Sequence, residues 1–106
     1  MNVLKSVNHI GYAVFDIQAT AEFYVNNGWT LSEVFDEKVQ HARIAFLTKE
    51  GFPKIELVSP LEGKSPVDKF LKSSGCCPYH ICYNVDSIDE AMEELYNNGF
   101  VPICSC

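Results

Sequence analysis

The sequence is poor in basic side chains: 8 Lys and Arg stand against 14 Asp and Glu, so its 106 residues carry a net charge of −6. Nucleic acids and anionic membrane surfaces are bound through basic patches, and this balance argues against both as partners. No apolar run approaches the length of a membrane span, and the N-terminus lacks the apolar stretch and cleavage site of a secretory signal. These absences predict a cytoplasmic protein.

Cysteine is missing from the first two thirds of the chain, and the five that occur are Cys76, Cys77, Cys82, Cys104 and Cys106. An odd, clustered set makes a poor disulfide framework and favours reduced thiols. The alternative is a thiolate zinc site built from the two pairs at positions 76 and 77 and at 104 and 106. That arrangement lacks the paired C-x₂-C spacing of common zinc sites, so reduced thiols are the preferred interpretation.

The chain contains a gapless internal repeat, in which residues 9–29 align with residues 80–100. Both copies share an opening His, then Ile, Tyr, Val, Ile and Glu, and a closing Asn-Asn-Gly. In each copy, a β-prone apolar segment is followed by a capped helical pattern, which predicts a strand and then a helix. Two copies of one unit indicate a pseudo-twofold fold, which could bring His9 and His80 together.

The length supports one hydrophobic core, so we expect a single domain over residues 1–106. It divides into a first β-α-β-β-β module (1–60), a connector (61–77) and a second, incomplete module (78–106). Strands are predicted where β-prone residues lie between turn signals: 7–14, 30–35, 42–48, 54–58, 79–85, and from Phe100 onward. Helices are predicted behind capping residues: 17–26 after Asp16, 66–72 after Ser65, and 87–97 after Asp86.

By the spacing of the first module, two strands of the second would fall past residue 106. A sheet without them exposes unpaired backbone groups, which invite pairing with another chain. We therefore expect a strand-completing homodimer, a partner chain or a truncated product, and the sequence alone does not choose among them.

Strand alternation places the two repeated histidines on one face of their strands, and Glu56 of the KIELV segment on the matching face of its own. On the other face of the second copy's strand, Ile81, Tyr83 and Val85 are expected to pack against the helix predicted at 87–97. Two imidazoles and one carboxylate suit a divalent ion such as Zn²⁺, Ni²⁺, Co²⁺, Fe²⁺ or Mn²⁺. The alternatives are histidines held in a hydrogen-bond network and a solvent-facing glutamate.

Other conspicuous side chains are expected to be structural. His41 has no repeat partner and lies among polar residues, so we expect it to be exposed. The acidic residues in and just before the helix predicted at 87–97 are expected to cap it and to form its solvated face: Asp86, Asp89, Glu90, Glu93 and Glu94. Five aromatic residues are expected in the core rather than as ligand-stacking groups: Phe23, Tyr24, Trp29, Phe46 and Phe70.

Three segments, HIGYAVFDI, KIELVSPLEGKSPVDKFL and YHICYNVDSIDEAMEEL, resemble the vicinal oxygen chelate superfamily (glyoxalase, bleomycin resistance and dioxygenase proteins). The match is nearest to its methylmalonyl-CoA epimerase and glyoxalase I branch. The resemblance implies an α+β fold of paired βαβββ modules around a metal, the second module truncated after its helix and following strand. It also implies His9, Glu56 and His80 as metal ligands. The family's fourth ligand, a glutamate on the last strand of the second module, would lie past residue 106.

The activity implied by this resemblance is that of a divalent-metal-dependent isomerase or lyase. Such an enzyme abstracts a proton next to the carbonyl of a thioester or hemithioacetal substrate. The remaining candidate for catalytic proton transfer is Glu56, or a residue lent by a second chain. A non-catalytic antibiotic-binding module and a truncated, inactive, strand-exchanging homologue are the alternatives. Four lysines could meet a CoA phosphate, although scattered lysines are normally only solvated: Lys54, Lys64, Lys69 and Lys72.

Overall fold

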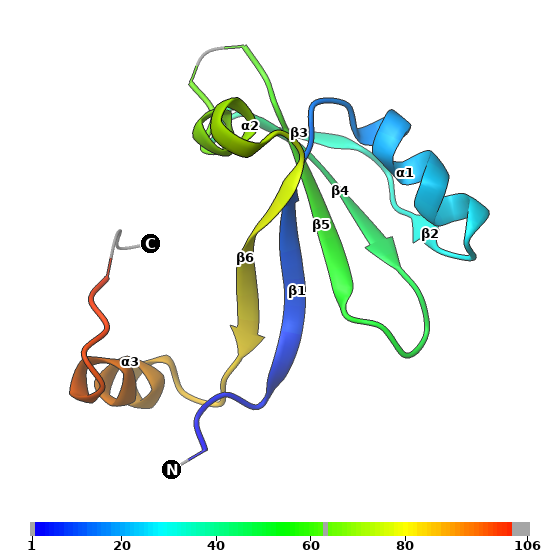
Figure 1. Ribbon diagram of the computed structural model, residues 1–106. Coiled ribbons are helices and arrows are strands. Elements are labelled where there is room, and N and C mark those ends of the chain that lie inside the picture. The colour runs from blue at the N-terminus through cyan, green and yellow to red at the C-terminus, as the bar shows by residue number, and fades with distance from the viewer. Residues whose placement is uncertain (1, 63, 103–106) are drawn as a thin grey trace.

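The computed structural model of the protein describes residues 2–62 and 64–102. It is a mixed α+β fold with one six-stranded sheet, in the order β2-β4-β5-β1-β6, and β3 pairs with β4 (Figure 1). This confirms the predicted fold class. None of the described helices is both long and apolar enough to cross a membrane. The elements are β1 (Ser6–Ala13), α1 (Ile17–Asn26), β2 (Thr30–Leu31), β3 (Phe35–Glu37), β4 (Ala42–Thr48), β5 (Lys54–Pro60), α2 (Asp68–Ser74), β6 (Cys77–Asn84) and α3 (Ile88–Asn97).

Strand β1 lies between β5 and β6 in the sheet. It runs parallel to β5, with Gly11 opposite Glu56, and antiparallel to β6, with Gly11 opposite His80. The parallel pair is possible because α1 and the β2–β4 strands supply the long connection that such pairing requires. Side chains from the beginning, middle and last third of the chain therefore meet in one row across three strands.

Helix α1 has the predicted bounds. The Asp16 carboxylate accepts the backbone N–H of Gln18 at 2.9 Å and so caps the first turn. The helix ends before Gly28, whose φ of 91° is a left-handed value that glycine adopts without strain. Its buried residues, Ile17 and Ala21, pack against one face of the sheet with the buried side chains of β4 and β5.

The opposite face of the sheet is covered at one end by α2, where buried Val67 and Leu71 pack with Ala13, Ile44 and Val58. This helix begins at Asp68, two residues later than predicted, and Ser65 does not cap it. The reason lies in the turn before it, where the Asp68 carboxylate accepts the Ser65 N–H at 2.9 Å and the Asp68 N–H bonds to the Ser65 carbonyl.

Several predicted boundaries also shift. The predicted strand 30–35 is two short strands, β2 and β3, because the segment between them leaves the β4 pairing. Ser87, not Asp86, caps α3: its hydroxyl accepts the Glu90 N–H at 3.2 Å. Residues 100–102 are not in a strand, so the strand predicted from Phe100 is wrong there, and residues 103–106 lie outside the described part.

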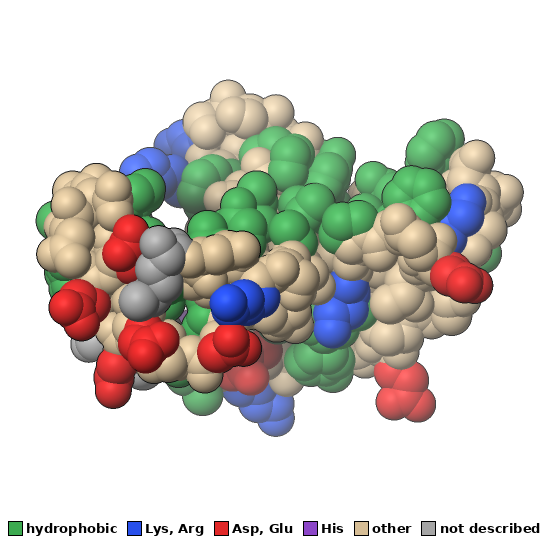
Figure 2. Space-filling model, turned by 90° about the horizontal axis from the view of Figure 1, so that it is seen from below, with side chains coloured by type: hydrophobic (Ala, Val, Ile, Leu, Met, Phe, Trp, Pro, Cys, Tyr) green, Lys and Arg blue, Asp and Glu red, His purple; other side chains and the backbone are tan. Residues whose placement is uncertain are grey.

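Helix α3 stands away from the sheet (Figure 1), and a gap separates it from the body in the space-filling view (Figure 2). Ala91 is its only buried residue, and Ile88 is 73% exposed. Ile81 and Tyr83 are 52% and 44% exposed, so the expectation that they pack against the helix is wrong. The radius of gyration, 15.3 Å, exceeds the roughly 13 Å of a compact domain of this length.

The expectations for the remaining side chains have mixed outcomes. Of the five aromatic residues, Phe23 is 66% exposed and Phe70 lies at the surface, whereas Tyr24, Trp29 and Phe46 pack against the core. His41 is exposed as predicted. Acidic side chains gather where α3 lies, at the left of Figure 2, in agreement with a solvated helix face.

Candidate metal centre

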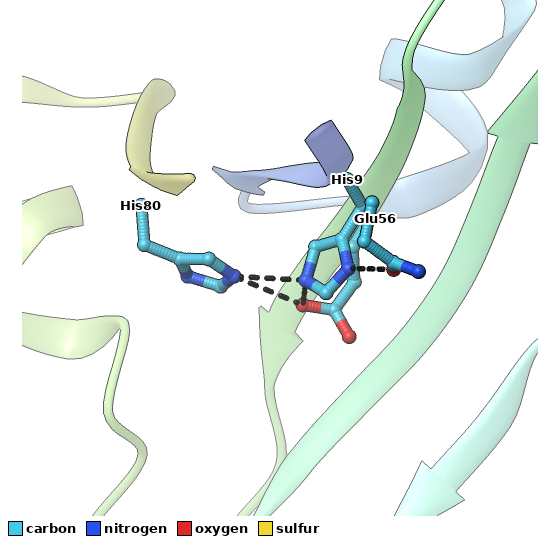
Figure 3. Close-up of polar contacts among 4 residues, drawn as sticks. His9, Glu56 and His80 are labelled. Atoms are coloured by element: carbon cyan, nitrogen blue, oxygen red, sulfur yellow. Dashed lines mark hydrogen bonds and ion pairs between the residues drawn. The ribbon is translucent and has the colours of Figure 1, made fainter. Parts of the chain in front are cut away.

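The structure brings His9, Glu56 and His80 together, although they come from three different strands (Figure 3). The two Nε2 atoms are 3.0 Å apart, and each lies 3.6 Å from Oε1 of Glu56. The side chains of His9 and Glu56 are 16% exposed, and that of His80 is 37% exposed. Three potential ligand atoms thus form a compact triangle on a partly accessible face of the sheet, here called the site face.

Gly11 makes this convergence possible. Glu56 and His80 stand on either side of it in the sheet, separated by the width of β1. A Cβ atom at position 11 would overlap the imidazole of His80, which therefore lies directly over the glycine backbone. A glycine inside a strand often marks such a close approach. Only the absence of a side chain here lets His80 reach across β1 toward Glu56.

The donor set and its spacing fit a divalent metal ion. Ligand atoms about 2.0–2.2 Å from an ion are separated by about 3.0–3.5 Å in octahedral or tetrahedral geometry, close to the observed 3.0 and 3.6 Å. Two histidines and one carboxylate leave coordination positions open for a small molecule. His9, Glu56 and His80 would be the residues that hold the ion.

A hydrogen-bond chain fixes the tautomer of His9. Its Nδ1–H donates to Asn8 Oδ1 at 2.8 Å, and Asn8 Nδ2 donates to Asn84 Oδ1 at 3.1 Å. Asn84 Nδ2 in turn donates to the Ser6 hydroxyl at 3.0 Å. Because Nδ1 carries the proton, the lone pair of His9 is on Nε2 and points into the triangle. Partners of this kind commonly orient metal-binding histidines.

Burial and neighbouring side chains determine the pKa and the ring contacts of His80. Burial lowers the pKa of His80 below its usual 6.5, and the nearby His9 lowers it further, while the Glu56 carboxylate opposes both effects. The Tyr79 ring meets His80 edge to face, with centroids 4.5 Å apart. Burial, and then the charge of Glu56, raise the pKa of Tyr79 to about 12. The lowered pKa of His80 favours its neutral imidazole, which is the form that binds a metal ion.

Sequence reasoning missed Asn8, Gly11 and Tyr79. Gly11 could have been found from the sequence, because it shares a strand face with the repeated His9, and a glycine inside a strand often marks a close approach of another group. Asn8 had none, because strand alternation predicts that it points away from the neighbouring His9.

Other candidate groups lie apart from this triangle. The His41 ring forms a hydrogen bond with the Glu62 carbonyl at 3.2 Å, and within residues 2–62 and 64–102 it makes no other. Cys76 and Cys77 are free thiols, while Cys104 and Cys106 lie outside the described residues, so the thiolate zinc alternative stays untested. A hollow of about 590 Å³ is formed between the start of α1 and the β3–β4 strands, and none of the three triangle residues lines it.

Comparison with known proteins identifies the family to which the chain belongs. The model of the Glyoxalase/Bleomycin resistance protein/Dioxygenase superfamily matches residues 8–105. The ethylmalonyl-CoA/methylmalonyl-CoA epimerase of Cereibacter sphaeroides is 36% identical over 99 residues, which are 92% of this chain and 73% of the relative. The uncharacterized protein YqjC of Bacillus subtilis is 34% identical over 94 residues, or 87% of this chain, which spans 66% of YqjC.

A solved structure agrees with these relatives. A variant of the Streptomyces coelicolor methylmalonyl-CoA epimerase, in complex with 2-nitronate-propionyl-CoA, superimposes with a TM-score of 0.79. The two are 27% identical, and the match covers 96% of this chain and 77% of the epimerase. With a family match over nearly its whole length and the shared fold, the chain belongs to the glyoxalase/bleomycin resistance protein/dioxygenase superfamily.

Proposed function

We propose that this chain is a divalent-metal-dependent isomerase of the methylmalonyl-CoA epimerase type, acting on a CoA thioester. The triangle of His9, Glu56 and His80 ligand atoms is the observation that carries this proposal. The names of the relatives supply the substrate class, since they include epimerases and a complex with a CoA thioester analogue. A hemithioacetal substrate, as for lactoylglutathione lyase, is less well supported because these relatives act on CoA thioesters by name.

Each residue of the site has a role in this proposal. His9, Glu56 and His80 hold the ion, and Asn8 keeps the His9 lone pair directed at it. A bound divalent ion would supply Lewis-acid stabilisation of the negative charge that develops on a carbonyl oxygen. Glu56 is our candidate for proton transfer: Oε1 faces both histidines, whereas its other carboxylate oxygen points away from them (Figure 3).

We further propose that the chain forms a homodimer through β6. Within residues 2–62 and 64–102, no strand pairs with the edge of β6 that faces away from β1. Exposed apolar side chains accompany this edge, Ile81 and Tyr83 among them. An open edge with apolar neighbours favours pairing with a second chain.

One experiment tests the metal and the activity together. Purified protein is analysed for metal content and for mass in solution, and methylmalonyl-CoA is then incubated with it in deuterated water. We expect one ion per chain, a dimer mass, and deuterium at the carbon next to the thioester carbonyl. His80→Ala should weaken metal binding by more than about tenfold, because even residues behind the ligands typically contribute that much.

His41→Ala is the matched control, since it removes an exposed imidazole far from the triangle and should leave metal content unchanged. Protein without bound metal, or His80→Ala with wild-type metal affinity, would refute the metal centre. Stoichiometric metal without deuterium exchange would instead favour the non-catalytic binding module.

A further inference from the structure

The two histidines of the triangle are held in different ways. The Nδ1–H of His9 donates to Asn8 Oδ1 at 2.8 Å, and polar partners of this kind commonly orient metal-binding histidines. The His80 ring has no such partner: within residues 2–62 and 64–102, its one hydrogen-bond contact joins its Nε2 to Nε2 of His9. The orientation of the His80 ring therefore depends on the groups that are packed around it.

A bulge in β6 places the Tyr79 side chain beside His80. Gly11 is opposite His80, but the next residue of β1 is opposite Pro78. Tyr79 therefore has no partner in β1 and is the extra residue of the bulge. Adjacent side chains of a regular strand point to opposite faces, whereas the centroids of the Tyr79 and His80 rings are 4.5 Å apart. The bulge thus brings both rings onto the site face.

Tyr79 is itself held in place by the core. Its ring packs against the hydrophobic cluster on the α2 side of the sheet, and the centroid of the Phe70 ring lies 5.1 Å from its own. The plane of the Tyr79 ring is turned 88° from that of His80, an edge-to-face arrangement that aromatic rings favour. Because Gly11 lies directly under the imidazole and Tyr79 stands beside it, the His80 ring is enclosed on two sides.

We propose that Tyr79 is the positioning residue of His80: its ring, in place of a hydrogen bond, directs Nε2 of His80 into the triangle. This inference rests on the proposed function, because it concerns how the same metal centre is assembled. The centre then orients its two histidines by two different means, a polar chain behind His9 and an aromatic ring beside His80. The ring of Tyr79 carries this role, and its hydroxyl group is not required for it.

The test titrates metal-free protein with Co²⁺ and follows the visible absorption of the bound ion. Tyr79→Leu, which removes the ring, should weaken Co²⁺ binding by about tenfold or more, the usual effect of losing a group that orients a metal ligand. Tyr79→Phe, which keeps the ring, should bind Co²⁺ as the wild type does. Tyr96→Leu is the matched control, because it makes the same change at a tyrosine of α3 that is 52% exposed, and it should leave Co²⁺ affinity unchanged.

A double-mutant cycle shows whether the loss of affinity passes through His80. In a His80→Ala background, Tyr79→Leu should have little further effect on Co²⁺ binding, because no imidazole remains to be oriented. An equal loss in both backgrounds would mean that Tyr79 supports the sheet as a whole, and it would overturn the inference. A loss in Tyr79→Phe as large as in Tyr79→Leu would do the same, because the hydroxyl group would then be the part that acts.

A measurement on the wild type does not depend on how the variants fold. The NMR spectrum of metal-free protein should show nuclear Overhauser contacts between the ring protons of Tyr79 and His80, whose centroids are 4.5 Å apart. The absence of these contacts would overturn the inference. Wild-type Co²⁺ affinity in Tyr79→Leu would also remove Tyr79 from the site and leave the proposed function standing, whereas wild-type protein that binds no Co²⁺ would refute both proposals.

Discussion

The two copies of the repeat adopt the same local structure but are packed very differently. Helices α1 and α3 both have a side-chain cap, and both end before a glycine with a left-handed φ, 91° at Gly28 and 87° at Gly99. Yet α1 buries Ile17 and Ala21, whereas α3 buries Ala91 alone. Helix formation is therefore encoded within each copy, because caps and stops act over a few residues.

Packing depends instead on what lies beside each copy. Helix α1 rests on β2, β4 and β5, which carry the buried Leu47 and Leu57. Strand β6 pairs with a described strand on one side only, so α3 has no comparable sheet surface to pack against. The second copy contacts the first mainly through the β1–β6 pairing, which we call the joint between the copies. The candidate metal centre lies at this joint. Comparing matched substitutions in the two copies shows whether this asymmetry persists in solution.

The largest expected difference concerns the first isoleucine of each helix. Ile17→Ala should lower the free energy of unfolding by about 2–4 kcal/mol, because it leaves a cavity in a packed core. Ile88→Ala should cost less than about 0.5 kcal/mol, because its side chain is 73% exposed. Urea denaturation of both variants measures the difference. An equally large loss for Ile88→Ala would mean that α3 is buried in solution, and the asymmetry would then not hold.

Much of the fold was predictable because the signals for it are local. The Asp16 cap and the Asn-Gly stop gave α1, and alternation between turn signals gave β4 and the core of β5. The convergence of His9 and His80 followed from the repeat, which relates the two positions before any packing is known.

Features that depend on pairing were not predictable. A register shift between Val7 and His9 breaks the alternation of β1, so the hydrogen bond from His9 to Asn8 could not be inferred. A second register shift occurs between Gly11 and Tyr12, opposite Tyr79. The Tyr79 ring packs against the core cluster that contains Val67 and Leu71. The exposure of Ile81 and Tyr83 was also missed. The alternating pattern of a strand predicts which side chains share a face, but it does not predict which element covers that face.

The next largest effect is expected at the joint between the copies. Gly11→Ala would place a methyl group in the His80 imidazole, and forcing an extra carbon into a filled space costs about 1–3 kcal/mol. The same displacement should move His80 out of the triangle and reduce metal affinity. Urea denaturation and a metal titration measure the two effects.

Combining this change with His80→Ala isolates its cause. If the imidazole is the obstacle, Gly11→Ala should cost much less stability in a His80→Ala background than in the wild type. Equal costs in both backgrounds would place the strain elsewhere in β1, and His80 would then not depend on Gly11 for its position.

The smallest expected effect is a pH dependence that originates in the second copy. Burial lowers the pKa of His80 in the folded protein below the 6.5 of the unfolded chain. Between these two pKa values the unfolded chain binds more protons than the folded protein, so the free energy of unfolding falls as the pH decreases through that window. The contribution of the neutral His80 to stability is complete above about pH 6.5. Melting temperatures of chelator-treated protein should therefore decline between about pH 7 and pH 5.

His80→Gln, which keeps a polar side chain but cannot take up the proton, should flatten that decline. His41→Gln, which makes the same change at an exposed imidazole outside the triangle, is the matched control. The carboxylates of the protein titrate in all three proteins, so only the difference between the curves reports on His80. Parallel curves for the wild type and His80→Gln would show that the imidazole is as solvated when folded as when unfolded. His80 would then not be seated against Gly11 and Tyr79, and the joint between the two copies would be looser than the distances in the triangle indicate.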